Sequence, residues 1–262
     1  MPVFYDQMNN AVNLPATSVR IISIVPSQTE LLFDMGLDEQ IAGITKFCIH
    51  PADKVKHVTK VGGTKQLNLE AIHKLQPDLI IANKEENEQS QVQELMRHYP
   101  VWVSDINDLH SALNMITMLG EVTGKQPEAV SLADSIFKQF GTLKPIDKET
   151  RVAYLIWRKP YMAAGQDTFI NSMLTLCGFK NVLTANRYPE VSADELVAAN
   201  PEVILLSSEP YPFAQKHIDE FKTILPDARV ILVDGELFSW YGSRLLHSPN
   251  YFKKLIKKLT AM

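Results

Sequence analysis

The chain has 262 residues, of which 45% are hydrophobic and 21% are charged, as in an ordinary globular protein. Its formal net charge of -4 argues against a general nucleic-acid binder. No apolar run approaches the roughly 20 residues needed to cross a bilayer. Cys48 and Cys177, the two cysteines, lie in opposite halves, which excludes a disulfide scaffold.

The N-terminal 20 residues carry neither a basic stretch nor an apolar core typical of an export signal. We therefore expect either a cytoplasmic protein or one whose export signal has been removed and replaced by a start methionine.

The first part of the chain alternates strands with helices. Short β-branched runs predict strands at 20–25, 40–45, 77–82 and 101–103. Helices are expected at 27–35, begun by a capping box from Ser27 to Glu30, at 69–76 after the capping residue Asn68, and at 88–98. Such alternation predicts parallel strand pairing with helices on the faces of the sheet.

Two consecutive helices are expected in the middle of the chain, at 109–123 and 127–143. The second would span about 25 Å at 1.5 Å per residue. We read it as one long rigid helix joining two Rossmann-like α/β lobes with parallel sheets. The predicted division is an N-terminal lobe at 1–124, a linking helix at 125–145 and a C-terminal lobe at 146–262, with function in the cleft between the lobes.

The second half repeats the pattern of the first. Strands are expected at 151–157, 201–206 and 229–233. Helices are expected at 167–176, 213–225 and 249–260, and a short helix is expected after the capping residue Ser192. In each half an acid, Glu70 or Asp194, precedes a proline, Pro77 or Pro201, by seven residues (77 − 70 and 201 − 194). This match indicates a pseudo-symmetric protein with two lobes.

Aromatic and arginine residues gather in the loops that follow the expected strands. Ligands of open parallel sheets bind beyond the carboxyl ends of the strands, and aromatic faces with a few polar groups suit a large, flat ligand. Arg158 and Arg244 could bind its carboxylates or phosphates. The alternative is that Trp157 and Trp240 fill the core between the lobes; we favour the binding site, because loops of this composition are more often functional.

Other chemistries find less support in the sequence. Cys48 and His50 lie close together, but no third or fourth metal ligand is near them, so we predict no metal site. A Cys48 nucleophile lacks a partner at a recognisable spacing. The run 62–65 lacks the spacing of a phosphate-binding loop, which disfavours nucleotide binding. We predict no catalytic residues.

Glu70 and Asp194 admit two interpretations. Acids in the first turn of a helix stabilise it through the helix dipole, and the residues alone favour this role. The other interpretation is that they are twin carboxylates, one on each lobe, that dock a two-fold symmetric partner.

The string RIISIVPSQTELLFDMG at 20–36, with Asn68-Leu69-Glu70 leading to Pro77-Asp78-Leu79-Ile80-Ile81, resembles the class III substrate-binding proteins of ABC importers. This family has a helical backbone and receives cobalamin, ferric siderophores and haem. The resemblance covers residues 20 to the C-terminus. The stretch 187–192 is similar to the segment that places an aromatic side chain over the corrin in cobalamin-binding members.

The resemblance implies ligand contacts through the strand-end loops. The ligand-binding residues expected from it and from loop composition are Phe47, His50, Trp157, Arg158, Tyr188, Tyr211, Trp240, Tyr241 and Arg244. It also implies that Glu70 and Asp194 dock to the permease dimer, which reverses the preference above. Two departures are that the family is exported or lipid-anchored, whereas this chain shows no signal, and that Asp194 stands where the family has Glu.

We therefore predict a monomeric, non-enzymatic binding protein with no intrinsic cofactor. Its ligand would be a corrinoid or a metal chelate, and its partner an ABC permease dimer. One stiff connection predicts little lobe closure on binding. The alternatives are a cytoplasmic enzyme that handles a metal or corrinoid through Cys48 and His50, and a sensor that keeps the fold without a transporter.

Overall fold

The computed structural model describes residues 2–14 and 20–261. Residues 1 and 15–19, part of the segment searched for an export signal, lie outside the described residues. The chain divides into two compact units. We call Met1–Ile106, His110–Phe137 and Tyr241–Arg244 the N-terminal unit, and Asn107–Leu109, Lys138–Trp240 and Leu245–Met262 the C-terminal unit. The predicted fold class is confirmed, since each unit is an α/β structure with a sheet of its own.

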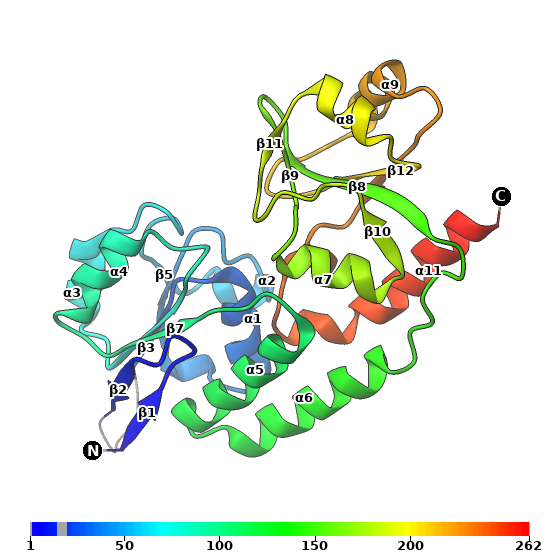
Figure 1. The fold of residues 1–262 in the computed structure, drawn as a ribbon. Coiled ribbons are helices and arrows are strands. Elements are labelled where there is room, and N and C mark those ends of the chain that lie inside the picture. Colours follow the sequence, from blue (N-terminus) through cyan, green and yellow to red (C-terminus); the bar gives the residue numbers. More distant parts are fainter. Residues whose placement is uncertain (1, 15–19, 262) are drawn as a thin grey trace. The chain divides into compact units, whose positions relative to one another are not determined.

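The N-terminal unit is built on a parallel five-stranded sheet of order β5-β4-β3-β6-β7. Its strands are β3 (Ile21–Ser23), β4 (Ile41–Ile44), β5 (Thr59–Lys60), β6 (Leu79–Asn83) and β7 (Val101–Ser104), and its helices are α1 (Pro26–Asp34), α2 (Ala52–Val55), α3 (Leu69–Leu75), α4 (Gln89–Met96) and α5 (Leu109–Thr123). One face of the sheet is covered by α3 and α4 (Figure 1), because Ile72, Val92 and Leu95 pack against Ile22 and Ile80.

The start of α1 differs from the prediction. The helix begins at Pro26, not through a capping box: Val25 is the N-cap, and the Ser27 hydroxyl has no hydrogen-bond partner among the described residues. A proline in the first turn has no N–H to satisfy and is already in the helical φ range, so the helix starts there without a side-chain cap.

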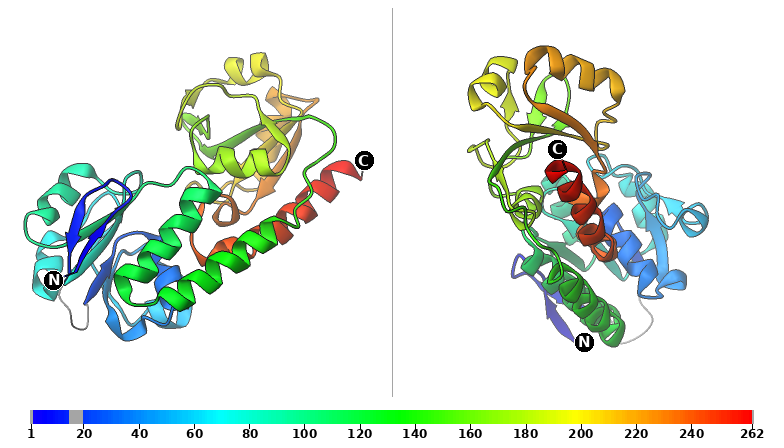
Figure 2. Two further views of the ribbon diagram at one scale, coloured as in Figure 1. Left: turned by 60° about the horizontal axis from the view of Figure 1, so that its bottom comes forward. Right: turned by 90° about the vertical axis from the view of Figure 1, so that its right-hand side faces the viewer.

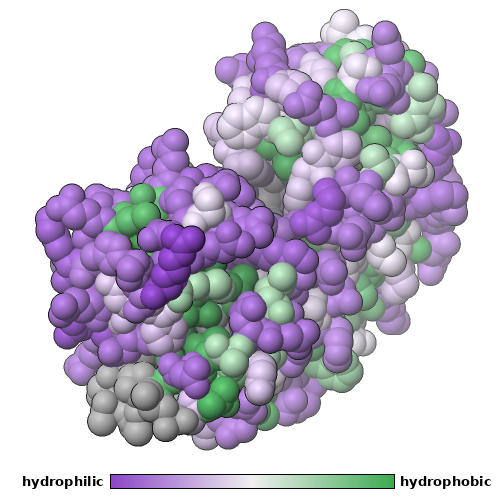
Figure 3. Space-filling view, turned by 60° about the vertical axis from the view of Figure 1, so that its left-hand side comes forward, coloured by the Kyte–Doolittle hydropathy of each residue, from purple (hydrophilic) through white to green (hydrophobic). Residues whose placement is uncertain are grey.

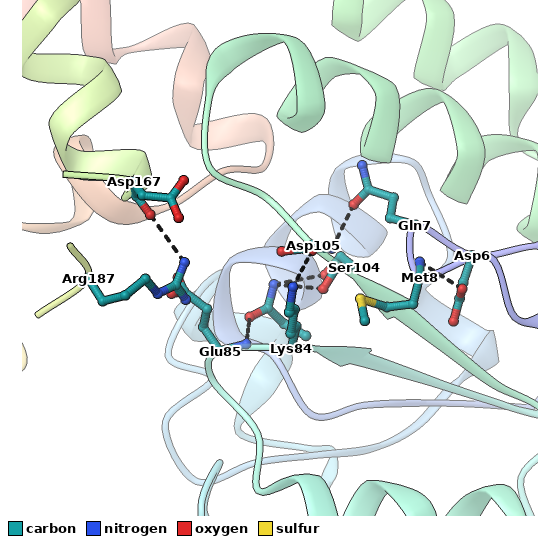
Figure 4. A network of polar contacts seen from close by, with 10 residues as sticks. Asp6, Gln7, Met8, Lys84, Glu85, Ser104, Asp105, Asp167 and Arg187 are labelled. Atoms are coloured by element: carbon teal, nitrogen blue, oxygen red, sulfur yellow. Dashed lines mark hydrogen bonds and ion pairs between the residues drawn. The ribbon is translucent and has the colours of Figure 1, made fainter.

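A hairpin of β1 (Val3–Tyr5) and β2 (Ala11–Asn13), not predicted from the sequence, lies beside β7 (Figure 4). Asp6 in its turn accepts hydrogen bonds from the backbone N–H groups of Met8 and Asn10, and also from that of Val103. Gln7 accepts one from the backbone of Asp105 at 3.0 Å. The turn therefore satisfies polar groups at the carboxyl end of β7.

The C-terminal unit has a mixed six-stranded sheet of order β11-β9-β8-β12-β13, with β10 also on β8. Its strands are β8 (Thr150–Trp157), β9 (Tyr161–Ala163), β10 (Phe179–Asn181), β11 (Glu190–Val191), β12 (Val203–Ser207) and β13 (Arg229–Val233), and its helices are α7 (Phe169–Leu176), α8 (Ala193–Ala199), α9 (Gln215–Ile224), α10 (Glu236–Ser239) and α11 (Ser248–Thr260). The prediction of parallel pairing holds for β8, β10, β12 and β13, whereas β9 and β11 form an antiparallel edge.

The core of the C-terminal unit follows the plan of the first. Leu196 of α8 and Phe221 of α9 pack with Leu155, Ile204 and Leu206 on one face of the sheet. The terminal helix α11 (red in Figure 2) contributes Phe252, whose ring packs against Phe238 and Phe140 with centroids 4.6 Å and 6.4 Å away. Each unit thus has a hydrophobic core of its own.

The central helices α5 and α6 (Gln126–Phe140) occur where they were predicted. The four residues Tyr241–Arg244, however, return to the N-terminal unit after the chain has built most of the C-terminal one. The chain therefore passes between the units more often than a single linking helix would require.

Candidate ligand-binding site

The predicted ligand contacts follow the carboxyl ends of parallel strands, where open sheets bind ligands. Phe47 and His50 follow β4, Trp157 ends β8 and Arg158 follows it, and Tyr211 follows β12. Tyr188 precedes the edge strand β11 and is half-buried. On the face shown in Figure 3 most residues are hydrophilic, and hydrophobic residues lie in groups among them.

The most exposed aromatic residue of the β8 and β12 loops is Trp157. Its side chain is 39% exposed, and its ring meets that of Tyr211 edge-on, with centroids 5.6 Å apart. The Tyr211 ring in turn packs against Phe213 at 4.8 Å. An indole that is supported from one side and open to solvent on another can receive the flat face of a ligand.

Arg158 beside Trp157 is held by an acid that the sequence did not point out. Its guanidinium forms an ion pair with Glu220 at 2.9 Å, and Glu220 also accepts a hydrogen bond from Tyr161. Burial and the bond to Glu220 raise the pKa of Tyr161 to about 12. The charge of Arg158 is therefore balanced within the C-terminal unit, and its contact with a ligand stays a prediction.

In the N-terminal unit, Phe47 is 51% exposed and the Lys46 ammonium lies 5.1 Å from the centre of its ring. His50 lies three residues along the same loop and is half-buried. Phe47 thus presents an aromatic surface next to a cation at the end of β4, consistent with its predicted contact with a ligand.

Arg244 makes a bidentate ion pair with Glu30 of α1, at 2.9 and 2.5 Å. Both side chains are largely buried, with 17% and 15% exposed. Its neighbours also bind acids of the N-terminal unit: the Ser243 hydroxyl donates a hydrogen bond to Asp34, and the Tyr241 hydroxyl donates one to Glu86. These contacts hold Tyr241–Arg244 in the N-terminal unit; ligand contacts of Tyr241 and Arg244 stay predictions.

Trp240 is 7% exposed, and its indole N–H donates to Glu209 at 2.9 Å. Ser239 donates to the same carboxylate oxygen at 2.7 Å. Burial raises the pKa of Glu209 above its ordinary value, and these two hydrogen bonds only partly oppose that effect. Glu209 is thus a buried acid close to a residue predicted to touch the ligand.

We predict that Glu209→Gln stabilises the protein near neutral pH. A carboxyl whose folded-state pKa is raised favours the folded state at low pH, and that contribution is lost as the pH rises through the folded-state pKa. Thermal unfolding of both proteins from pH 4 to pH 8 checks this. The melting temperature of the variant should rise relative to that of the wild type as the pH rises. A difference in melting temperature that does not change with pH would contradict the prediction.

Cys48 is 2% exposed and lies 3.1 Å from the Thr29 hydroxyl and 3.3 Å from that of Thr45. Burial raises its pKa, against the smaller lowering effect of these hydrogen bonds. A thiol that is neutral and shielded is a poor nucleophile. The environment of Cys48 therefore argues against the enzyme built on Cys48 and His50.

We expect iodoacetamide to modify Cys48 of the native protein at pH 7.5 at least about a hundredfold more slowly than in the unfolded chain. Mass spectrometry of the digested protein distinguishes it from Cys177, which is also buried. Rapid labelling of Cys48 alone would revive the nucleophile hypothesis.

The predicted docking acids occupy equivalent places in the two units. Asn68 caps α3 by accepting the N–H of Ala71, and Ser192 caps α8 in a complete capping box. Glu70 and Asp194 lie in the first turns of these helices and are exposed. Both helices end in a residue with a left-handed backbone conformation, Gln76 after α3 and Asn200 after α8.

The same arginine arrangement holds both helices. Arg20 donates its backbone N–H to Asp78 and its guanidinium to the carbonyl of Leu75, the last residue of α3. In the other unit Arg151 makes the corresponding bonds to Glu202 and to Ala199, the last residue of α8. The two segments that match in the sequence therefore also share these two arginine hydrogen bonds in the structure.

Residues 21–224 match the model of the family described as periplasmic binding protein. The chain belongs to this family. It is 27% identical to an uncharacterized ABC transporter substrate-binding lipoprotein, YvrC, of Bacillus subtilis, over 92% of this chain and 81% of the relative. It is 25% identical to a vitamin B12-binding protein of Pectobacterium carotovorum, over 93% and 89% of the two chains.

The fold is also that of solved binding proteins. The periplasmic heme-binding protein BhuT, in complex with two hemes, superposes with a TM-score of 0.80 at 22% identity, over 94% of this chain and 99% of that chain. Among the described residues, no helix has both the length and the hydrophobicity needed to span a bilayer. Within the same residues, no group of three or more His, Cys, Asp or Glu side chains is placed to hold a metal ion.

Proposed function

We propose that the protein captures a corrinoid or an iron chelate and delivers it to an ABC importer. The observation that carries this is the exposed indole of Trp157 on its Tyr211 support, in a chain whose family consists of binding proteins. The names of the relatives, which include vitamin B12-binding and heme-binding proteins, support a flat macrocyclic ligand. Ligand contacts of Phe47, His50 and Tyr188 stay predictions.

The second part of the proposal concerns the importer. Glu70 and Asp194 would each bind a basic site on one subunit of a permease dimer. Their support is the equivalent framework of α3 and α8 in two separately folded units. We propose that the protein works as a monomer outside the cytoplasmic membrane; the names of its periplasmic and lipoprotein relatives support this location.

The direct test is a calorimetric titration with cyanocobalamin, cobinamide, haemin and a ferric siderophore. Tryptophan fluorescence gives a second signal, because Trp157 is exposed whereas Trp102 is fully buried. Binding of at least one compound in the micromolar range or tighter would support the proposal. Absence of binding to all four would refute the ligand class.

We predict that Trp157→Ala lowers the affinity for the compound that binds by about ten- to a hundredfold, since a central aromatic contact typically contributes about 1.4–2.7 kcal/mol. Phe137→Ala is the matched control, because Phe137 of α6 is also exposed, at 65%, but lies outside the strand-end loops. Equal affinities of the two variants would remove Trp157 from the site.

A further inference from the structure

Two groups of hydrogen-bonded side chains lie near Trp157 in the C-terminal unit: Arg158 and Tyr161 bind Glu220, and Tyr211 pairs with His217. We propose that Tyr211 donates its hydroxyl proton to an oxygen atom on the rim of the bound ligand, and that His217 fixes the direction of that proton. The inference rests on the proposed function and adds to it a residue that selects the ligand.

The first step is the tautomer of His217. Its Nδ1 lies 2.8 Å from the backbone nitrogen of Ala214, at the start of α9. A backbone N–H can only donate, so Nδ1 must accept and carries no proton. His217 is 1% exposed, and burial together with Lys216 and Arg158 lowers its pKa, which opposes protonation. The single proton of the neutral ring is therefore on Nε2.

The second step is the direction of the Tyr211 proton. The Nε2 atom of His217 lies 3.1 Å from the Tyr211 hydroxyl, so it donates to that oxygen. The oxygen thus accepts a bond from His217, and its own proton must point to another acceptor; among residues 2–14 and 20–261 the Tyr211 hydroxyl has no other hydrogen-bond partner that could accept it.

The third step concerns the ligand atom that would accept the Tyr211 proton. Tyr211 is half-buried and supports the exposed Trp157, so its proton lies beside the surface offered to the ligand. Glu220 balances the charge of Arg158. A neutral oxygen is therefore acceptable as well as a charged one. The matching ligand has a flat face for Trp157 and, at its edge, an amide carbonyl or a carboxylate oxygen.

The test compares three variants in titrations with cobinamide, whose rim carries amides, and haemin, whose rim carries carboxylates. Tyr211→Phe keeps the ring packing and removes the donor, and we expect about tenfold weaker binding. His217→Asn keeps an acceptor for the N–H of Ala214 but removes the donor to Tyr211. We expect about threefold weaker binding from it, and no further loss when it is combined with Tyr211→Phe.

Tyr161→Phe is the matched control, because the Tyr161 hydroxyl already donates to Glu220. It should change the affinity by less than about twofold. Thermal unfolding of each variant shows that it is folded. A measurement that needs no ligand is the ¹⁵N spectrum of the His217 ring, which should show the proton on Nε2.

The outcomes separate the two proposals. If the wild type binds a compound and Tyr211→Phe binds it equally well, or if the proton of His217 is on Nδ1, the inference is wrong and the proposed function stands. If the wild type binds none of the four compounds, cyanocobalamin, cobinamide, haemin and the ferric siderophore, both the inference and the proposed function are wrong. If Tyr211→Phe weakens the binding of cobinamide alone, the rim oxygen belongs to an amide. If it weakens the binding of haemin alone, the oxygen belongs to a carboxylate.

Discussion

Reversing the charge of both docking acids, with Glu70→Lys and Asp194→Lys in one chain, should reduce ligand uptake through the importer by at least about a hundredfold. Loss of a complementary charge pair typically costs about 2–5 kcal/mol, and the variant places like charges opposite the permease at two positions. Ligand affinity should be unchanged, because both acids are exposed on α3 and α8 and belong to no strand-end loop.

Uptake into vesicles that contain the permease is the measurement, with binding to detergent-solubilised permease as a second readout. The control chain carries Asp134→Lys and Asp227→Lys, one exposed acid from each unit and the same change in net charge. If the control chain loses as much uptake, the effect is one of overall charge and the docking hypothesis is wrong. Unchanged uptake by the Glu70 and Asp194 variant would also refute it.

The second large effect concerns Arg244. We expect Arg244→Met to destabilise the protein by about 2–4 kcal/mol, because it leaves the carboxylate of Glu30 largely buried without its ion-pair partner. Replacing both residues, with Arg244→Met and Glu30→Leu, should recover most of this loss, since no unpaired charge then remains. Urea unfolding gives the free energies of unfolding.

Arg97→Met is the matched control for this series. Arg97 also forms an ion pair, with Glu94, but its side chain is 72% exposed, and such pairs typically contribute less than about 1 kcal/mol. Similar losses from Arg97→Met and Arg244→Met would contradict the assignment of Arg244 as a buried anchor.

Local patterns were sufficient to predict most of the helices and parallel strands. The helix at 109–123 was predicted from apolar spacing alone, and α5 has the same bounds. Asn68 and Ser192 were identified as capping residues, and both accept a backbone N–H as expected. Periodicity and capping involve residues within a few positions of one another, so they leave a trace in the sequence.

Features that depend on distant residues were missed. The strands β9 and β11 have three and two residues, too short for a periodic pattern, and they join the sheet only through the pairing of β9 with β8 and of β11 with β9. Glu30 and Arg244 are 214 positions apart. The sequence assigned Glu30 only to a capping box, so its ion pair with Arg244 appears only in the folded chain.

The sequence predicted some residues of the candidate site and missed others. Trp157 and Tyr211 were selected by loop composition, and their rings are in contact. His217 and Glu220, which orient Tyr211 and Arg158, belong to a helix that looks amphipathic and ordinary in the sequence. A residue that acts through another one carries no motif, and only the hydrogen bonds identify it.

The return of Tyr241–Arg244 has a consequence for biosynthesis. A ribosome must translate the chain as far as Arg244 before the N-terminal unit possesses all of its residues. That unit cannot mature fully while the nascent chain is being elongated, although its sheet is complete much earlier. Polypeptides that terminate ahead of codon 241 should consequently be substrates for quality-control proteases, even though they contain every strand of the first sheet.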